Sequence, residues 1–194
     1  MEREVIWAAW EGPGLEHLRL VASDGSTVAN GLVIGMEGGR PFRIGYEIRC
    51  DARWRVREIR VAAPDSGRPG IDLLADGEGH WTTRGGEAVP ELEGCVDVDV
   101  SATPFTNTLP IRRLGLGPEE SAELDVAYVA VPELVARPET QRYVCLNKRA
   151  DGGLYRFEAP PSEVLPSGFT AEIPVDTDGL VIDYPGLFRR AWSG

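Results

Sequence analysis

Two carboxylates, Asp97 and Asp99, lie two positions apart in a run of valines and are the first candidates for chemistry. Successive side chains of a β-strand point to opposite faces, so both carboxylates share one face, with their backbone positions roughly 6–7 Å apart. Such a pair suits a divalent metal, a general acid–base pair or hydrogen bonds to sugar hydroxyls. The alternative interpretation is a solvated outer face with the valines in the core.

The segment Thr103–Leu114 follows directly and is rich in hydroxyl, amide and guanidinium groups. Its two prolines fix the backbone locally, so we expect an irregular loop that presents side chains rather than a ladder strand. Arg112 and Arg113 stand out in an acidic chain, because arginine matches the geometry of carboxylates, phosphates and vicinal hydroxyls. They could also neutralise Asp97 and Asp99 as internal ion pairs, and the two interpretations are compatible.

Aromatic side chains are scattered over many of the predicted strands, among them Trp10, Tyr46, Trp54 and Tyr184. We expect most of them in the core. In a curved sheet some would also line a cleft, where an aromatic face can stack on a sugar ring or contact an acyl chain.

Motifs of common enzyme and cofactor sites are missing: the sequence has no GxSxG, no P-loop and no GxGxxG. Three widely spaced cysteines without a CxxC pair argue against a zinc site and a disulfide framework. The net charge of −11 disfavours binding to nucleic acids and anionic membranes. We therefore expect no cofactor, no metal and no nucleic-acid partner. Without a signal peptide or a long apolar run, a cytoplasmic protein that is not integral to the membrane is expected.

Short β-strands are the elements that must position these residues. Alternation with a period of two runs through Ile44–Cys50, Leu124–Tyr128, Phe169–Val175 and Leu180–Tyr184. In Trp54–Ala62 the phase slips, which predicts a bulge or a strand that crosses between environments. Turn pairs separate the runs: Asp24-Gly25, Gly38-Gly39, Asp76-Gly77, Gly85-Gly86, Asp151-Gly152 and Asp178-Gly179.

The even spacing of the turns predicts an all-β fold. We count roughly eleven to thirteen strands and no convincing helix, since Pro118–Glu123 reads as a turn between strands. A flat open sheet of this size would leave its edges and one face bare, so we expect a many-stranded antiparallel meander rolled into a barrel or half-barrel. With no repeat and no linker, residues 1–194 form one predicted domain.

Three segments resemble the bacterial putative glycolipid-binding family: Gly94–Asp99, Thr103–Arg113 and Val181–Phe188. The opening Trp10–Glu16 and the Tyr46–Arg55 stretch are similar as well, so the resemblance covers nearly the whole chain. It implies a spiral β-roll of many antiparallel strands, related in shape to the half-barrels of lipoprotein carriers. It also implies a glycolipid ligand and assigns no catalytic role to any residue.

We interpret the chain as a non-catalytic binding protein for an amphiphilic ligand such as a glycolipid, held in a cleft of the rolled sheet. The cleft walls would be Trp10, Tyr46, Trp54 and Tyr184, and the polar head group would meet Asp97, Asp99, Thr106, Asn107, Arg112 and Arg113.

Two alternatives stay open. In a structural or interaction module, the polar run would be an internal network, and Arg112 would be a buried charge partner whose loss destabilises the protein. In an enzyme, Asp97 or Asp99 would act with Arg112 on a sugar or a small anionic substrate. The sequence leaves the oligomeric state open.

Overall fold

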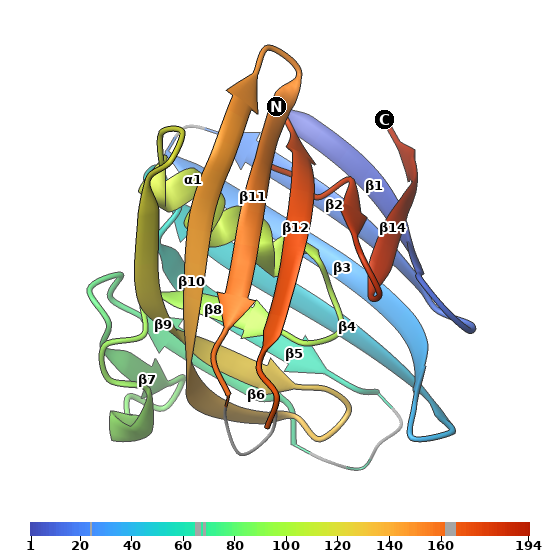
Figure 1. Ribbon diagram of the computed structural model, residues 1–194. Helices are drawn as coiled ribbons and strands as arrows, with labels where there is room; N and C mark the ends of the chain where they lie inside the picture. The colour runs from blue at the N-terminus through green and yellow to red at the C-terminus, as the bar shows by residue number, and fades with distance from the viewer. Residues whose placement is uncertain (24, 65–66, 68, 162–165) are drawn as a thin grey trace.

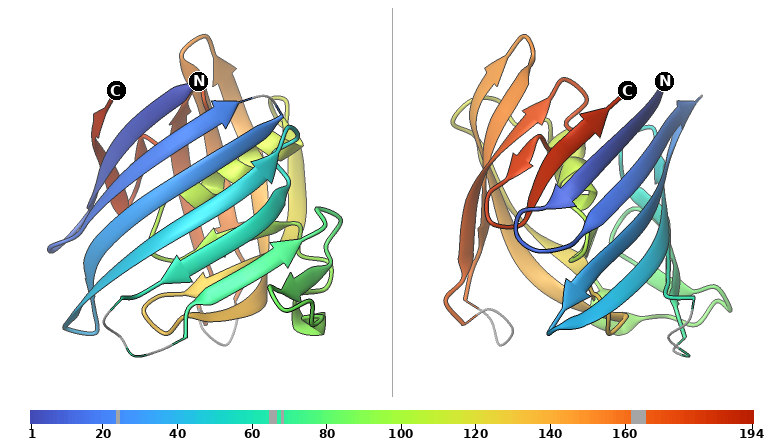
Figure 2. Two further views of the ribbon diagram at one scale, coloured as in Figure 1. Left: turned by 180° about the vertical axis from the view of Figure 1, so that it is seen from behind. Right: turned by 90° about the vertical axis from the view of Figure 1, so that its right-hand side faces the viewer.

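Two β-sheets face each other in the computed structural model, which describes residues 1–194 except 24, 65–66, 68 and 162–165 (Figures 1 and 2). Sheet A has nine strands in the order β13–β14–β1–β2–β3–β4–β5–β6–β7. Sheet B has five, in the order β12–β11–β10–β9–β8. Neighbouring strands are antiparallel except β8 and β9, which are parallel. The described strands do not close into a barrel, and the all-β prediction is confirmed.

The strands have the following bounds. Sheet A contains β1 (Glu2–Ala9), β2 (Leu15–Ser23), β3 (Ser26–Glu37), β4 (Arg40–Asp51), β5 (Val56–Ala62), β6 (Ile71–Ala75), β7 (Trp81–Thr83), β13 (Asp183–Tyr184) and β14 (Phe188–Ser193). Sheet B contains β8 (Asp97–Val100), β9 (Ser121–Ala130), β10 (Val135–Arg149), β11 (Gly152–Ala159) and β12 (Phe169–Asp176).

The patterns read from the sequence explain how β3, β4 and β5 pair. Gly38 and Gly39 form the two-residue turn between β3 and β4, and both have the positive φ that such a turn requires (54° and 76°). The predicted phase slip is a bulge: Cys50 of β4 pairs with Val56, but the preceding Arg49 pairs with Glu58. The extra residue on β5 shifts the alternation of its side chains. The predicted turn at Asp24-Gly25 lies partly outside the described residues.

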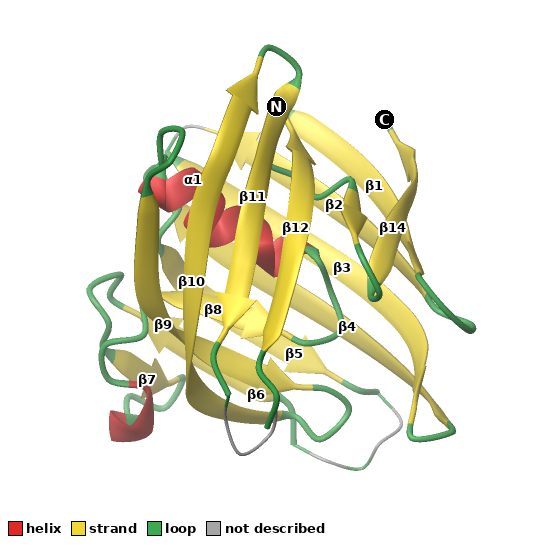
Figure 3. Cartoon of the chain, in the orientation of Figure 1, coloured by secondary structure: helices red, strands yellow, loops and turns green. Residues whose placement is uncertain are grey.

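The prediction of an irregular loop over Thr103–Leu114 is wrong. The segment forms a 3-10 turn, η2 (Phe105–Asn107), followed by the helix α1 (Thr108–Leu114). Pro110 lies in the first turn of α1, where a backbone N–H has no helical acceptor, so proline costs little there. Gly115 ends the helix in the left-handed conformation at φ 61°. Figure 3 shows α1 in red behind the strands of sheet B.

The strand predicted over Leu180–Tyr184 is also largely wrong. Only a single bridge from Val181 to Val175 and the two-residue strand β13 form there. Leu180 and Val181 are both buried. Neighbouring residues of a strand point to opposite faces, so a strand with one solvent-exposed face buries only one of them. Here Leu180 packs in one core cluster and Val181 in the other, so both are buried.

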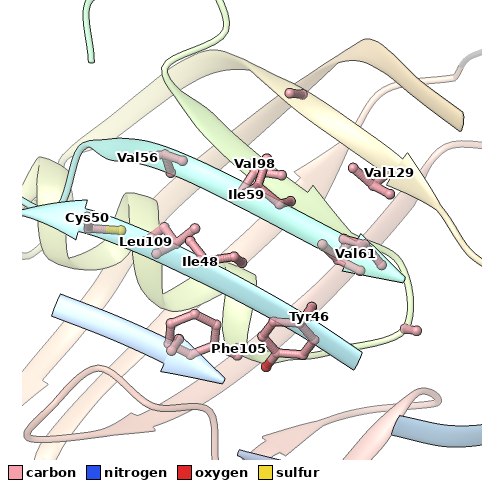
Figure 4. Close-up of a cluster of buried hydrophobic side chains, with 14 of the residues drawn as sticks. Tyr46, Ile48, Cys50, Val56, Ile59, Val61, Val98, Phe105, Leu109 and Val129 are labelled. Carbon is pink, nitrogen blue, oxygen red and sulfur yellow. The ribbon is translucent and has the colours of Figure 1, made fainter. Parts of the chain in front are cut away.

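Helix α1 lies between the sheets and separates two hydrophobic clusters. Leu109 belongs to the cluster under sheet A, where Phe105 and Leu109 face the inner side chains of β4 and β5 (Figure 4). Ile111 belongs to the cluster under sheet B, with Tyr143 and Phe157. The helix therefore fixes the spacing of the sheets along part of their length and leaves room between them elsewhere. Within the described residues, no helix is long and apolar enough to cross a membrane.

Candidate functional site

A cavity of about 570 Å³ lies between the two sheets. Sheet A contributes Trp7, Val33 and Phe42, and sheet B contributes Tyr128 and Ala130. Its rim is shared with a wider surface depression of about 1090 Å³ at the β3–β4 hairpin, which gives the cavity an approach from solvent. Cavities of roughly 300–1,000 Å³ with mostly apolar walls and a few polar groups are the usual form of small-molecule sites.

Glu16 is the buried polar group of this cavity. It lies on β2 in phase with the core residues Leu18 and Leu20, and only 1% of its surface is exposed. Its Oε1 accepts hydrogen bonds from the Tyr46 hydroxyl at 2.5 Å and from the Thr103 hydroxyl at 2.7 Å. Its Oε2 has no hydrogen-bond partner among the described residues. Burial raises the pKa of Glu16 to about 8, against the two hydrogen bonds, which lower it.

Tyr46 reaches Glu16 because β3 has a glycine opposite it. Gly31 pairs with Tyr46 across the sheet, and a Cβ on Gly31 would lie 2.1 Å from the tyrosine ring. The ring occupies the space of the missing side chain. Gly35 gives similar room to Phe42, a wall of the cavity. Two glycines on the inner face of one strand thus shape this end of the site.

We expect Gly31→Ala to displace Tyr46 and to lower the free energy of unfolding by about 1–3 kcal/mol, as overpacking does in a filled core. Gly45→Ala is the matched control, because a Cβ there meets its nearest side chain at an ordinary 3.4 Å. Urea unfolding of both variants measures the difference. If Gly31→Ala is no less stable than Gly45→Ala, the ring does not depend on this glycine.

Asp97 forms an ion pair inside the fold instead of facing solvent. Its side chain is 0% exposed. Its Oδ2 accepts hydrogen bonds from Arg113 Nη2 at 2.6 Å and Nε at 3.0 Å, and Nε also donates to Oδ1 at 3.1 Å. Burial raises the pKa of Asp97, and Arg113 acts against that shift. The valines of this strand, Val98 and Val100, belong to the core cluster under sheet A, as the alternation predicts.

Asp99 has polar neighbours instead of a cation. Its Oδ1 accepts a hydrogen bond from the Thr106 hydroxyl at 2.8 Å, and its Oδ2 accepts one from Gln141 Nε2 at 2.6 Å. Asn107 lies beside them, where its Oδ1 accepts a hydrogen bond from the Tyr143 hydroxyl at 2.9 Å. These contacts tie β8, η2 and β10 together, so Asp99, Thr106 and Asn107 already have partners within the fold.

Arg112 is exposed. It is therefore not the buried charge partner that we expected for a structural or interaction module. Its guanidinium lies over the Trp54 ring, with Cζ 5.1 Å from the ring centroid. Nη1 donates a long hydrogen bond of 3.4 Å to the Thr177 carbonyl. The neighbouring Arg113 has the buried role instead, because successive residues of a helix point about 100° apart.

The remaining predicted wall residues, Trp10 and Tyr184, do not line the cavity. Trp10 is 38% exposed and its backbone N–H bonds to the Leu187 carbonyl beside the cavity. Tyr184 packs into an aromatic cluster with Phe157, Phe169 and Phe188, whose ring centroids are 5.9–6.5 Å from its own. Of the ten predicted site residues, Tyr46 contacts the cavity's polar group, and none is itself a lining residue.

Comparison with known proteins identifies the family. The sequence matches the family model described as "Putative glycolipid-binding" over residues 4–190. The chain belongs to the putative glycolipid-binding family. It is also similar to the crystal structure of a DUF1089 family protein from Pseudomonas aeruginosa, at 38% identity and a TM-score of 0.76, with 93% of this chain and 95% of that one covered. None of the curated proteins compared with it matches. The resemblance seen in the sequence is confirmed.

Sequence reasoning missed Glu16, although it lies in the opening segment Trp10–Glu16 that resembles the putative glycolipid-binding family. The signal was present in the alternation of Glu16, Leu18 and Leu20, which places the carboxyl on the buried face. A carboxylate that shares a face with core leucines is rare without a partner or a function. Among the described residues, no cluster of three or more His, Cys, Asp or Glu could hold a metal ion.

Proposed function

We propose that this protein binds an amphiphilic molecule without catalysis, with a glycolipid as the fitting class, and that the ligand occupies the cavity between the sheets. The observation that carries the proposal is Glu16, which lines a cavity with both apolar and polar walls and whose Oε2 is buried without a partner among the described residues. A molecule with an apolar tail and a hydroxylated head needs this combination of surfaces. The description of the family points to the same class.

The proposal moves the head-group contact away from the polar run of the sequence. Asp97, Asp99, Asn107 and Arg113 have partners within the fold, so we assign them, with Thr106, to the scaffold that holds α1 against sheet B. Tyr46 acts through Glu16. We assign Trp10 to the surroundings of the cavity, because it bonds to the lining residue Leu187. We assign the Trp54–Arg112 contact and the aromatic cluster around Tyr184 to the stability of the fold. The cytoplasmic location remains a prediction from the sequence.

Titration with octyl β-glucoside, below its critical micelle concentration, tests the proposal by calorimetry. We expect saturable binding, and at least a tenfold weaker affinity for Ala130→Phe, whose ring would fill part of the cavity. Ala150→Phe is the control, because it puts the same ring on the exposed turn between β10 and β11. Equal affinities for the two variants would place binding outside the cavity. A complete lack of binding would count against the proposed function.

A further inference from the structure

Only one of the two oxygens of the Glu16 carboxyl group has hydrogen-bond partners among the described residues. Both lone pairs of Oε1 are used, by the hydroxyls of Tyr46 and Thr103, and Oε2 is buried without a partner. Among the described residues, no Arg, Lys or His forms an ion pair with it. A buried atom of this kind is costly to maintain unless something outside the protein satisfies it.

The protonation state follows from the same surroundings. Burial keeps the pKa of Glu16 at about 8, and burial and the neighbouring Glu16 raise the pKa of Tyr46, so both groups hold their protons at neutral pH. Because Oε1 already accepts two hydrogen bonds, the proton belongs on Oε2. Oε2 of Glu16 is then an O–H donor, and the group that would satisfy it is a hydrogen-bond acceptor.

The charges around the cavity limit which acceptor can enter. Glu11 and Glu37 also line it, and the one cation among the described lining residues is Arg137. Arg137 donates to the Glu139 carboxylate at 2.9 Å and stacks on the Tyr128 ring, so its charge is neutralised locally. Inside the cavity, an anionic head group would therefore meet Glu11 and Glu37 without a free cation among the described lining residues.

We propose that Glu16 is the specificity-determining residue of the cavity, that its Oε2–H donates a hydrogen bond to an uncharged hydroxyl, ether or carbonyl oxygen of the ligand, and that the site selects uncharged over anionic and cationic amphiphiles. This inference rests on the proposed function, because it assigns the head-group contact within the same cavity. A cationic amine is the opposite case, since it would bind the ionised carboxylate and release the proton of Glu16.

Three probes with the same eight-carbon tail separate these cases: octyl β-glucoside, octanoate and octylamine. Calorimetry near pH 8, in two buffers of different ionisation enthalpy, measures both affinity and proton exchange. We expect octyl β-glucoside to bind tightest and with proton uptake, because a bound acceptor stabilises the protonated acid. Tighter binding of octylamine with proton release, or of octanoate, would overturn the inference.

Two variants keep the test independent of folding defects. Glu16→Gln retains an acceptor for Tyr46 and Thr103 and an N–H donor toward the cavity, so we expect affinity for octyl β-glucoside within about threefold of wild type, without proton uptake. Glu16→Met has similar length and no donor, and should bind at least tenfold more weakly. Each must first show a cooperative unfolding transition.

The outcomes separate the two proposals. If octyl β-glucoside binds and Ala130→Phe blocks it, but Glu16→Met binds like wild type, the inference fails and the proposed function stands. If none of the three probes binds the wild-type protein, the proposed function fails and the inference fails with it.

Discussion

Arg113→Ala is expected to lower the free energy of unfolding by about 3–5 kcal/mol, the usual cost of leaving one member of a buried ion pair without its partner. The Asp97 side chain is 0% exposed and that of Arg113 is 19% exposed, so the pair lies largely out of contact with solvent. For a chain of this length the melting temperature should fall by roughly 6–20 °C. Asp97→Asn added to Arg113→Ala should recover part of the loss, because no charge then stays buried.

Arg112→Ala is the matched control for this prediction. Arg112 is the adjacent residue of the same helix, but it is exposed and contacts the Trp54 ring, a cation–π contact of about 0.5–1 kcal/mol at an exposed site. Urea unfolding of both variants compares them directly. Equal losses of stability would contradict the assignment of Arg113 as the scaffold's buried cation.

Glu16→Gln is expected to make stability less dependent on pH. The folded protein holds the Glu16 proton to about pH 8, whereas the unfolded chain releases it near pH 4.5. Folding therefore takes up a proton between these values, and wild-type stability falls as pH rises, at about 1.4 kcal/mol per pH unit. The contribution is fully present below pH 4.5 and is lost above about pH 8, a change on the order of 4–5 kcal/mol.

The glutamine variant has no such proton, so its stability relative to wild type should rise steadily from pH 5 to pH 8. Asp51, Asp72 and Asp76, whose hydrogen bonds to neighbouring groups lower their pKa values, titrate alike in both proteins and cancel in the difference. Urea unfolding at pH 5, 6, 7 and 8 gives this difference. A constant difference across that range would show that folded Glu16 is ionised.

Strands β4 and β5 of sheet A and the turn between β3 and β4 could be predicted from the sequence because each strand has one buried face, so the alternation reports the fold directly. Even the bulge at Cys50 and Val56 left its mark as a phase slip. Helix α1 left no such mark. It has only seven residues and is covered on more than one side, because Leu109 and Ile111 are buried in different clusters.

The polar residues were harder to place than the strands. The pattern of β8 predicts which side chains share a face, and Asp97 does lie opposite Val98 and Val100. It cannot tell that the second face is covered by α1 and β10, because that cover depends on residues far away in the sequence. Glu16 was overlooked for a related reason: its partners Tyr46 and Thr103 lie 30 and 87 residues away.

An NMR titration observing alanine methyl groups tests the central claim, that the space between the sheets is a ligand site, most directly. Octyl β-glucoside should shift the methyl signals of Ala9, Ala102 and Ala130, which line the cavity, and leave those of Ala150 and Ala191 unchanged on the exposed surface. Shifts confined to exposed alanines, with the three cavity methyls unmoved at saturation, would contradict the account.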